Sequence, residues 1–161
     1  MKTIKLRLES ETETRKFGIG LGKLAGQGDV ICLDGELGSG KTTLTQAIAL
    51  GMGIDKNCYV TSPSFNIFHE YPGNIPLYHM DFYRLTNSDD VGEMGLDEYF
   101  YRSGVTVIEW AGRALDILPQ GRLSIFLTGS GQNARVAVCT YPEALWQERV
   151  TVLLKTVSRS Q

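Results

Sequence analysis

One segment of the chain has the residue types and spacing that bind a polyphosphate. It reads Gly35-Glu36-Leu37-Gly38-Ser39-Gly40-Lys41-Thr42 and matches the full G-x-x-x-x-G-K-[ST] pattern. In this pattern the glycines turn backbone N–H groups toward phosphate oxygens, the lysine reaches the β- and γ-phosphates, and the threonine hydroxyl can ligate Mg²⁺. A helix that begins here adds the positive end of its dipole. The segment therefore predicts a site for a nucleoside triphosphate and Mg²⁺.

The sequence on both sides predicts the strand and the helix that such a loop requires. The residues before it, 29–33, form a short apolar run with β-branched members, which is typical of a buried strand. After the loop, Leu44, Ala47, Ile48 and Gly51 fall at helical spacing. Strand, loop and helix thus follow in the required order, and a glycine-rich turn that binds nothing is the disfavoured alternative.

Glu109 is the favoured carboxylate for holding Mg²⁺ together with Thr42. Enzymes with this loop usually place such an acid at the end of a neighbouring strand. Glu109 directly follows Val105-Thr106-Val107-Ile108, a β-branched run that indicates a buried parallel strand. The alternative is a surface glutamate that pairs with an arginine.

Asp81 is the second candidate acid, placed near the γ-phosphate. It lies in the strand pattern from Pro76 to Arg84, where it shares one face with His79 and Tyr83. This strand looks half exposed, so an ordinary surface aspartate is the alternative. His79 and His69 are not predicted to bind metal, because no Cys or His partner lies at suitable spacing.

Two further features leave alternatives open. Thr61-Ser62-Pro63-Ser64-Phe65 carries three hydroxyls beside a proline, about where many triphosphatases have a mobile segment that senses the γ-phosphate. Thr61 is the predicted sensor, and a polar turn that enters a strand is the equal alternative. Trp110, directly after Glu109, either packs in the core or presents its ring at an interface.

Bulk composition predicts one ordinary globular domain over residues 1–161. The chain has 161 residues and a net charge of −2, and it has no dense Lys/Arg run, which argues against a large nucleic-acid surface of its own. The three cysteines include no C-x-x-C pair, which fits a reducing compartment. No stretch approaches 18 apolar residues, so no membrane span or membrane partner is expected. The predicted location is the cytoplasm.

The remaining patterns predict strands alternating with helices, an α/β fold. Strands are expected at 3–8, 66–71, 76–84, 104–108, 122–128 and 134–141. Helices are expected after a capping box at Ser10 to Glu13, at 96–102, at 111–118, and from Pro142 to about 157. Around a phosphate loop, this order predicts a three-layer sandwich typical of P-loop NTPases, with a mixed, largely central sheet.

Several of these segments, taken in order, resemble the TsaE family, small bacterial ATPases required for making threonylcarbamoyladenosine in tRNA. The resemblance covers about residues 10 to 128. Its H-x-D-x-Y-R and I-E-W elements, joined to this loop, are much more specific than the loop alone. The matching residues are Gly35 to Leu44, Ser62-Pro63-Ser64-Phe65, His79-Met80-Asp81-Phe82-Tyr83-Arg84-Leu85, Gly95-Leu96-Asp97-Glu98-Tyr99 and Ile108-Glu109-Trp110.

The resemblance implies specific roles in binding ATP and Mg²⁺. It makes Lys41 and Thr42 the phosphate and Mg²⁺ ligands, and Glu109 completes the metal site. Asp81 is then essential, and the segment around Thr61 is the switch. The residues implied for nucleotide binding are Gly35, Glu36, Leu37, Gly38, Ser39, Gly40, Lys41, Thr42 and Thr43, with Thr12 and Arg135 near the base.

The resemblance also implies partners. Family members act with TsaD and TsaB, which carry the threonylcarbamoyl transfer, while TsaE hydrolyses ATP to ADP and supports turnover of that complex. Contact with tRNA is then indirect, through the complex. The helix from Pro142 departs from the compact family pattern, either as an added partner surface or as packing.

Three other functions remain as alternatives. A small-molecule kinase would have the same loop, but it would need an acceptor pocket and usually an Arg-rich lid, and the sequence has no such arginine cluster. A GTPase would carry an N-K-x-D element, which is missing here. An assembly factor would bind nucleotide without significant turnover.

Overall fold

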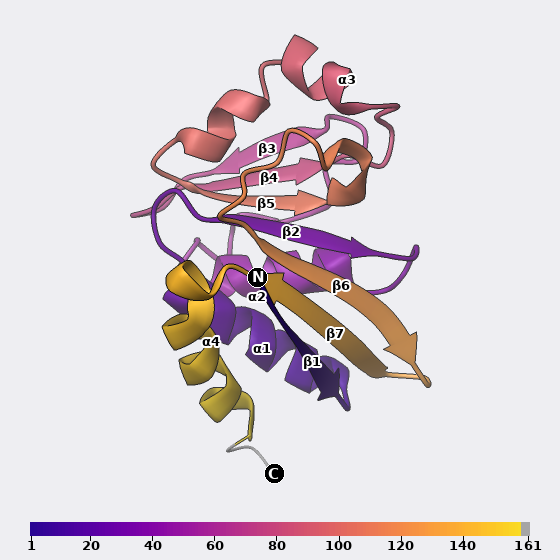
Figure 1. Cartoon of the computed structure of the whole chain (residues 1–161), viewed down its shortest axis with the longest axis vertical. Helices are drawn as coiled ribbons and strands as arrows, with labels where there is room; N and C mark the ends of the chain where they lie inside the picture. The colour runs from indigo at the N-terminus through magenta and orange to yellow at the C-terminus, as the bar shows by residue number, and fades with distance from the viewer. Residues whose placement is uncertain (159–161) are drawn as a thin grey trace.

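A computed structural model describes residues 1–158, and they form one seven-stranded sheet with helices on both faces (Figure 1). Residues 159–161, the end of the predicted domain range, lie outside the described residues. The elements in chain order are β1 (Lys2–Leu8), α1 (Glu11–Leu24), β2 (Val30–Gly35), α2 (Lys41–Gly51), β3 (Phe68–Tyr71), β4 (Leu77–Asp81), α3 (Ser88–Glu93), the 3₁₀ helix η1 (Asp97–Tyr101), β5 (Val105–Glu109), the 3₁₀ helix η2 (Ala111–Ala114), β6 (Leu123–Ser130), β7 (Ala134–Tyr141) and α4 (Glu143–Ser158).

The sheet is mixed, as predicted. Its strand order is β1-β7-β6-β2-β5-β4-β3, and β2 pairs in parallel with both β5 and β6. β4 is parallel to β5, whereas β3, β7 and β1 are antiparallel to their neighbours. Because β2, β4 and β5 run in one direction, their carboxyl ends meet at the same edge of the sheet. Ligand sites of open α/β sheets occupy this edge.

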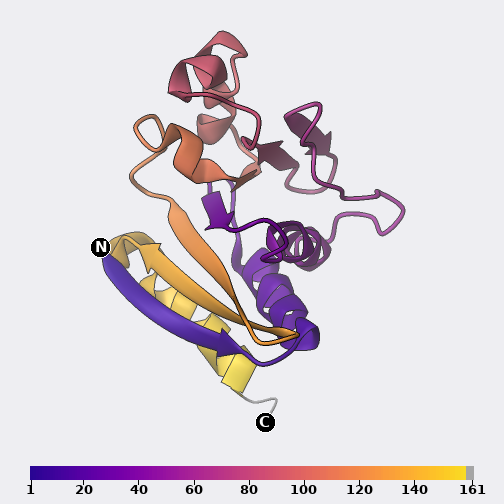
Figure 2. The same ribbon diagram turned by 90° about the vertical axis from the view of Figure 1, so that its right-hand side faces the viewer.

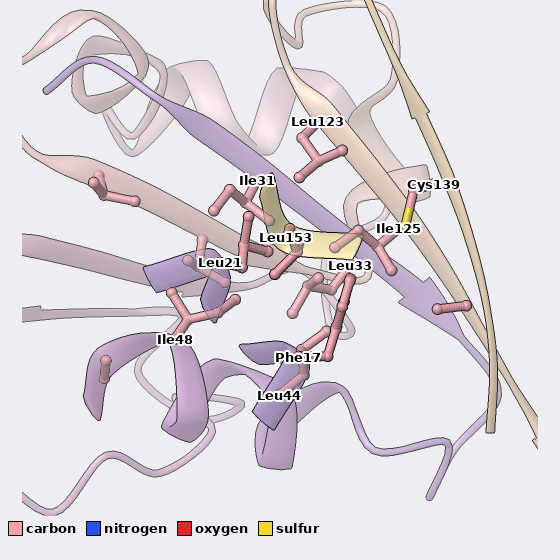
Figure 3. Packing of buried hydrophobic residues seen from close by; sticks show 14 of the residues in the cluster. Phe17, Leu21, Ile31, Leu33, Leu44, Ile48, Leu123, Ile125, Cys139 and Leu153 are labelled. Carbon is pink, nitrogen blue, oxygen red and sulfur yellow. The ribbon is translucent and has the colours of Figure 1, made fainter. Parts of the chain in front are cut away.

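The larger core lies between the sheet and the long helices α1, α2 and α4. In Figure 3, Phe17 and Leu21 of α1 and Leu44 and Ile48 of α2 gather against Ile31 and Leu33 of β2. Figure 2 shows that β6, β7 and β1 curve away from the central strands, and α4 packs against α1 and β7 as part of the larger core. This curvature lets the same cluster continue from α2 to α4.

A second core covers the opposite face of the central strands, so the predicted three layers are confirmed. Val30, Cys32, Met80 and Ile108 point to this side and pack against α3, η1 and η2. These three helices are short, so the second layer consists of single turns joined by loops (Figure 1).

Helices α1 and α2 pack unusually closely through glycines. A Cβ on Gly22 would lie 2.1 Å from the carbonyl oxygen of Ile48, and one on Gly51 would lie 2.2 Å from that of Ile19. Real Cβ atoms do not approach oxygens this closely. Both positions therefore need glycine so that α2, which carries the loop at its start, can lie against α1.

The predicted final helix exists and belongs to the core. Trp146, Val150 and Leu153 of α4 are buried against the sheet and α1. The Trp146 indole N–H donates to the Gly121 carbonyl at 2.9 Å, and Arg149 pairs with Asp29 at the start of β2. In the described part of the chain, no helix is long and apolar enough to cross a membrane.

The structure corrects three local predictions. The strand expected at 76–84 ends at Asp81. The expectation that it is half exposed was wrong: all of β4 is buried, because β3 and β5 flank it and η1 packs over Tyr78. The helix expected at 111–118 is only the single turn η2. Ser10 does cap α1, but the Glu13 carboxylate accepts from Glu9 N–H rather than closing a capping box.

Candidate functional site

The glycine-rich loop 35–42 connects β2 to α2 in the predicted order, and two of its glycines are required by geometry. Gly35 has φ +140°, and a Cβ there would lie 2.2 Å from the Leu127 carbonyl oxygen of the adjacent β6. Gly40, the N-cap of α2, has φ +105°. Only glycine adopts these conformations without strain. The first N–H groups of α2 have no acceptor within the helix, as at every helix start, and are the groups that an anion site needs.

Lys41 begins α2, and its ammonium turns back into the loop. Nζ donates to the carbonyl oxygens of Gly35 at 2.7 Å and Glu36 at 2.9 Å, with Ser39 Oγ at 3.4 Å. Burial lowers the pKa of Lys41, and the nearby Glu109 and Asp81 carboxylates oppose this shift by favouring the cation. The loop therefore encloses its own positive charge at the point where phosphate would arrive.

Glu109 ends β5 with its carboxylate against the start of α2. The side chain is buried, and its Oε2 accepts a hydrogen bond from the Thr42 hydroxyl at 2.9 Å. Thr45, one turn further along α2, is 3.4 Å from Oε1. The structure thus brings together the two residues predicted to hold Mg²⁺.

Asp81 ends β4 directly beside Glu109, its register partner on β5. It is buried, in contrast to the surface aspartate considered as an alternative. Oδ1 accepts the Tyr83 backbone N–H at 2.9 Å, and Oδ2 accepts the hydroxyl of Ser62. Two carboxylates therefore stand side by side at the edge of the sheet, next to Lys41.

The hydroxyl that reaches this cluster comes from Ser62, the neighbour of the predicted sensor Thr61. Thr61 is exposed, and its backbone N–H donates to the Tyr71 hydroxyl at 3.3 Å. Ser62 and Ser64 line the hollow described below, whereas Thr61 is not part of its wall.

Trp110 covers the loop from the side of β5. The Lys41 ammonium lies 4.0 Å from the centre of its ring, and Tyr83 packs against the ring at 5.0 Å between centres. Trp110 has φ +58°, and Ile67, whose carbonyl accepts from Asp81 N–H, has φ +67°. Among the described residues these are the two non-glycine positions with positive φ, and both adjoin the same cluster. Such strain is concentrated at functional sites.

These groups surround one hollow of about 390 Å³ at the carboxyl edge of the sheet. It combines one cation, two carboxylates, several hydroxyls and loop N–H groups, which is the chemistry needed to hold a polyphosphate and a divalent cation. Its walls are formed by Leu37, Gly38, Gly40, Lys41, Thr42, Thr43, Ser62, Ser64, Asp81, Tyr83, Glu109 and Trp110.

A smaller hollow of about 60 Å³ lies on the other side of Gly40 and Thr43. Arg135 of β7 lines it and is fixed to the loop by donating from Nε to the Ser39 carbonyl at 2.8 Å. Thr12 is exposed and does not line this hollow; its neighbour Glu11 does. Of the two residues expected near the base, the structure thus joins Arg135 to the loop.

The donor set fits Mg²⁺ of the kind that such loops hold. Within residues 1–158, no group of three or more His, Cys, Asp or Glu side chains surrounds a metal position. Mg²⁺ does not need one, since it is commonly bound by one or two protein oxygens, substrate phosphates and several waters. The hydroxyl of Thr42 beside the buried carboxylate of Glu109 provides this minimal set.

Sequence patterns alone did not single out Ser62, Tyr83 or His79 as members of the site. Tyr83 and His79 share a face with Asp81 by simple alternation, which was the available signal. For Ser62 the sequence showed three neighbouring hydroxyls without indicating which would point inward.

Comparison with known proteins identifies relatives over most of the chain. A family model described as "Threonylcarbamoyl adenosine biosynthesis protein TsaE" matches residues 8–137. The chain is 43% identical to the tRNA threonylcarbamoyladenosine biosynthesis protein TsaE of Bacillus subtilis, over 84% of both chains. It is 40% identical to the protein of the same name from Treponema pallidum, over 73% of this chain and 86% of that one. The crystal structure of Bacillus subtilis YdiB superimposes with a TM-score of 0.76 at 37% identity and covers 98% of this chain and 95% of that chain, so it extends beyond the family match.

Proposed function

The chain belongs to the TsaE family, and from this premise we propose that it is a Mg²⁺-dependent ATPase that supports threonylcarbamoyladenosine modification of tRNA. The family match and the relatives' names supply the pathway. The hydrolytic activity is our inference from the hollow around loop 35–42. The protein has three free cysteines, of which Cys32 and Cys139 are buried, and this agrees with a reducing, cytoplasmic setting.

One observation carries the proposal: the Thr42 hydroxyl donates to the buried Glu109 carboxylate at 2.9 Å, beside Lys41. A packing role does not account for a buried carboxylate here, because a buried charge is costly unless it is paired. In phosphate-loop enzymes, the loop threonine and a strand-end acid hold Mg²⁺ between them. Glu109 and Thr42 occupy these two places.

The positions of the side chains support the following roles. The loop N–H groups and Lys41 would bind and orient the β- and γ-phosphates, and Thr42 with Glu109 would hold Mg²⁺. When bound, Mg²⁺ neutralises charge that develops on the phosphate oxygens. Asp81, fixed by Ser62 and by Tyr83 N–H, is placed to accept a hydrogen bond from the attacking water and so orient it toward the γ-phosphate.

The same hollow explains why a partner is expected. In the described chain its wall contains one cation, Lys41, and no arginine. An arginine supplied in trans raises the rate of related triphosphatases by about 10³–10⁵. We therefore propose slow hydrolysis by the isolated protein and faster hydrolysis with TsaB and TsaD, through which it acts on tRNA indirectly. A net charge of −2 agrees with this indirect contact.

The test is ATP turnover by the purified protein, with and without the TsaB–TsaD complex, for the wild type and for Glu109→Ala. We expect the wild type to release ADP and phosphate, and the partners to accelerate this release. Glu109→Ala should lose both the turnover and its acceleration. Lys41→Ala serves as the binding control. If the partners leave turnover unchanged, the activation proposal is wrong.

The same samples separate the alternative functions. A kinase would transfer the γ-phosphate to a metabolite, so phosphate release without an acceptor argues against it. A GTPase would be stabilised more by GTP than by ATP in a thermal-shift assay with Mg²⁺; a ligand at 100 times its dissociation constant adds about 2.7 kcal/mol. An assembly factor would keep its function in cells with Glu109→Ala.

A further inference from the structure

His79 is a fully buried histidine in the middle of β4, and its ring contacts the Glu109 side chain of the site. Its Nε2 lies 2.8 Å from Oε1 of Glu109. It sits two residues before Asp81, so both side chains leave β4 on the same face. β4 and β5 are parallel, and His79 pairs with Val107, two residues before Glu109. The ring therefore reaches forward along β5 to the carboxylate.

The other ring nitrogen of His79 has no hydrogen-bond partner within residues 1–158. Nδ1 is buried and unpaired, one of two such side-chain atoms in this part of the chain. Burying an unpaired polar atom is unfavourable, and a leucine or phenylalanine in the same space would avoid the cost. Packing alone therefore does not explain a histidine here, and its contact with Glu109 is the remaining polar interaction.

The contact fixes which end of the Glu109 carboxylate faces the loop. Oε1 accepts from His79, while the Thr45 hydroxyl, which donates to the Lys41 carbonyl at 3.0 Å, lies 3.4 Å from it. Oε2 accepts from Thr42 at 2.9 Å. With Oε1 held from the core side, the carboxylate cannot rotate without breaking its hydrogen bond to His79.

We propose that His79 is a positioning residue for the Mg²⁺ site: its Nε2–H holds Oε1 of Glu109 so that Oε2 stays directed at Thr42 and the metal. The inference rests on the proposed function, because it assumes Mg²⁺ at Thr42 and Glu109. The carboxylate of Glu109 is an acceptor, so the hydrogen of the ring belongs on Nε2. Groups that orient a metal ligand in this way typically contribute about 10- to 100-fold to metal affinity.

Two substitutions separate the hydrogen bond from packing. In His79→Gln the amide N–H₂ can occupy the place of Nε2 and donate to Glu109. In His79→Asn the shorter amide corresponds to Nδ1 and does not reach Oε1. The measurement is the apparent dissociation constant of Mg²⁺ at saturating ADP, followed by thermal shift, together with ADP binding in EDTA. Neither readout depends on turnover.

We expect His79→Asn to weaken Mg²⁺ binding by about 10- to 100-fold, with ADP binding in EDTA unchanged and His79→Gln close to the wild type. In a Glu109→Ala background, adding His79→Asn should change nothing further. If Asn behaves like the wild type, or if Gln is as weak as Asn, the positioning role is wrong. If the wild type itself shows no Mg²⁺-dependent binding of ADP, it is the proposed function that fails.

A measurement on the wild type keeps the inference testable if a variant does not fold. Nitrogen-15 NMR of the His79 ring should place the hydrogen on Nε2, and its signal should shift when Mg²⁺ is added to the ADP complex. The proposal would be overturned by a hydrogen on Nδ1, or by a ring signal that does not change when Mg²⁺ is added.

Discussion

The Lys41 ammonium lies 4.0 Å from the centre of the Trp110 ring while it donates to carbonyl oxygens of its own loop. With Ser39 Oγ at 3.4 Å, each of its three N–H groups has a protein acceptor. A phosphate that binds this loop must therefore compete for at least one of these hydrogens. The indole ring is placed to sense that exchange, because it is packed against the cation itself.

We predict that binding of a nucleoside triphosphate changes the fluorescence of Trp110. The chain has two tryptophans, and Trp146 is buried in α4 with its N–H on Gly121, so it contributes a constant background. A titration of the wild type with ATP and Mg²⁺ should show a saturable change that Trp110→Phe removes. A change of equal size in Trp110→Phe would show that the signal arises elsewhere.

We predict that Ser62→Ala lowers ATP turnover by about 10- to 100-fold, since a hydrogen bond to a charged group contributes roughly 1.5–3 kcal/mol. Ser62 donates to Asp81, and without it the carboxylate loses one of the two groups that fix it. Thr61→Ala is the matched variant, because Thr61 is exposed and outside the wall of the hollow. Steady-state kinetics should show the larger loss for Ser62→Ala. A larger loss of turnover in Thr61→Ala would instead support Thr61 as the residue that senses the γ-phosphate.

We predict opposite effects of two glycine-to-alanine changes on stability. A Cβ at Gly22 would lie 2.1 Å from the Ile48 carbonyl oxygen, so Gly22→Ala must push α1 from α2 at a cost of about 1–3 kcal/mol. Gly92 in α3 has nothing within 4 Å of a Cβ and no positive φ. Gly92→Ala should therefore stabilise the protein by about 0.4–1 kcal/mol. Urea unfolding measures both, and a neutral Gly22→Ala would refute the close packing.

We predict that one of the three cysteines reacts with a thiol reagent in the folded protein. Burial raises the pKa values of Cys32 and Cys139 to about 12, so both thiols remain protonated at pH 8. Burial also keeps the reagent away from both side chains. Cys58 is partly exposed and is the expected site. Mass spectrometry after alkylation should find one label in native buffer and three in denaturant. Native labelling of Cys32 would mean that β2 opens.

The local chemistry of the site was predictable from sequence because each of its main parts lies within one short stretch of the chain. Loop 35–42 is a single motif, and Glu109 follows a run that has few interpretations other than a buried strand. Because enzymes with this loop usually have an acid at the end of a neighbouring strand, Glu109 was expected near Thr42, and the structure finds its carboxylate 2.9 Å from the Thr42 hydroxyl. Asp81 was the second candidate acid from its strand pattern, the resemblance made it essential, and the structure places it beside Glu109.

What the sequence did not predict depends on contacts between distant segments. β4 carries His79 and Asp81, polar residues that suggest an exposed face, yet that face is buried, and hydrogen bonds to Glu109 and Ser62 offset the cost of burying them. The inward turn of Ser62 depends on the path of a loop with no regular spacing. The helix expected at 111–118 ends at Ala114, and the Asp34 carboxylate on β2 fixes the start of this turn by accepting from Gly112 N–H at 2.9 Å.

The pairing of β1 with β7 has a consequence for synthesis of the protein. Lys2 is opposite Tyr141, and Leu8 is opposite Arg135, so β1 lacks its neighbour until the much later β7 has left the ribosome. Contacts this distant in sequence form slowly, because a long loop must close first. Arg135, which fixes the glycine-rich loop through Ser39, arrives on the same strand. A nascent chain therefore carries the complete phosphate-binding motif for many residues before the fold that fixes that loop can close around it.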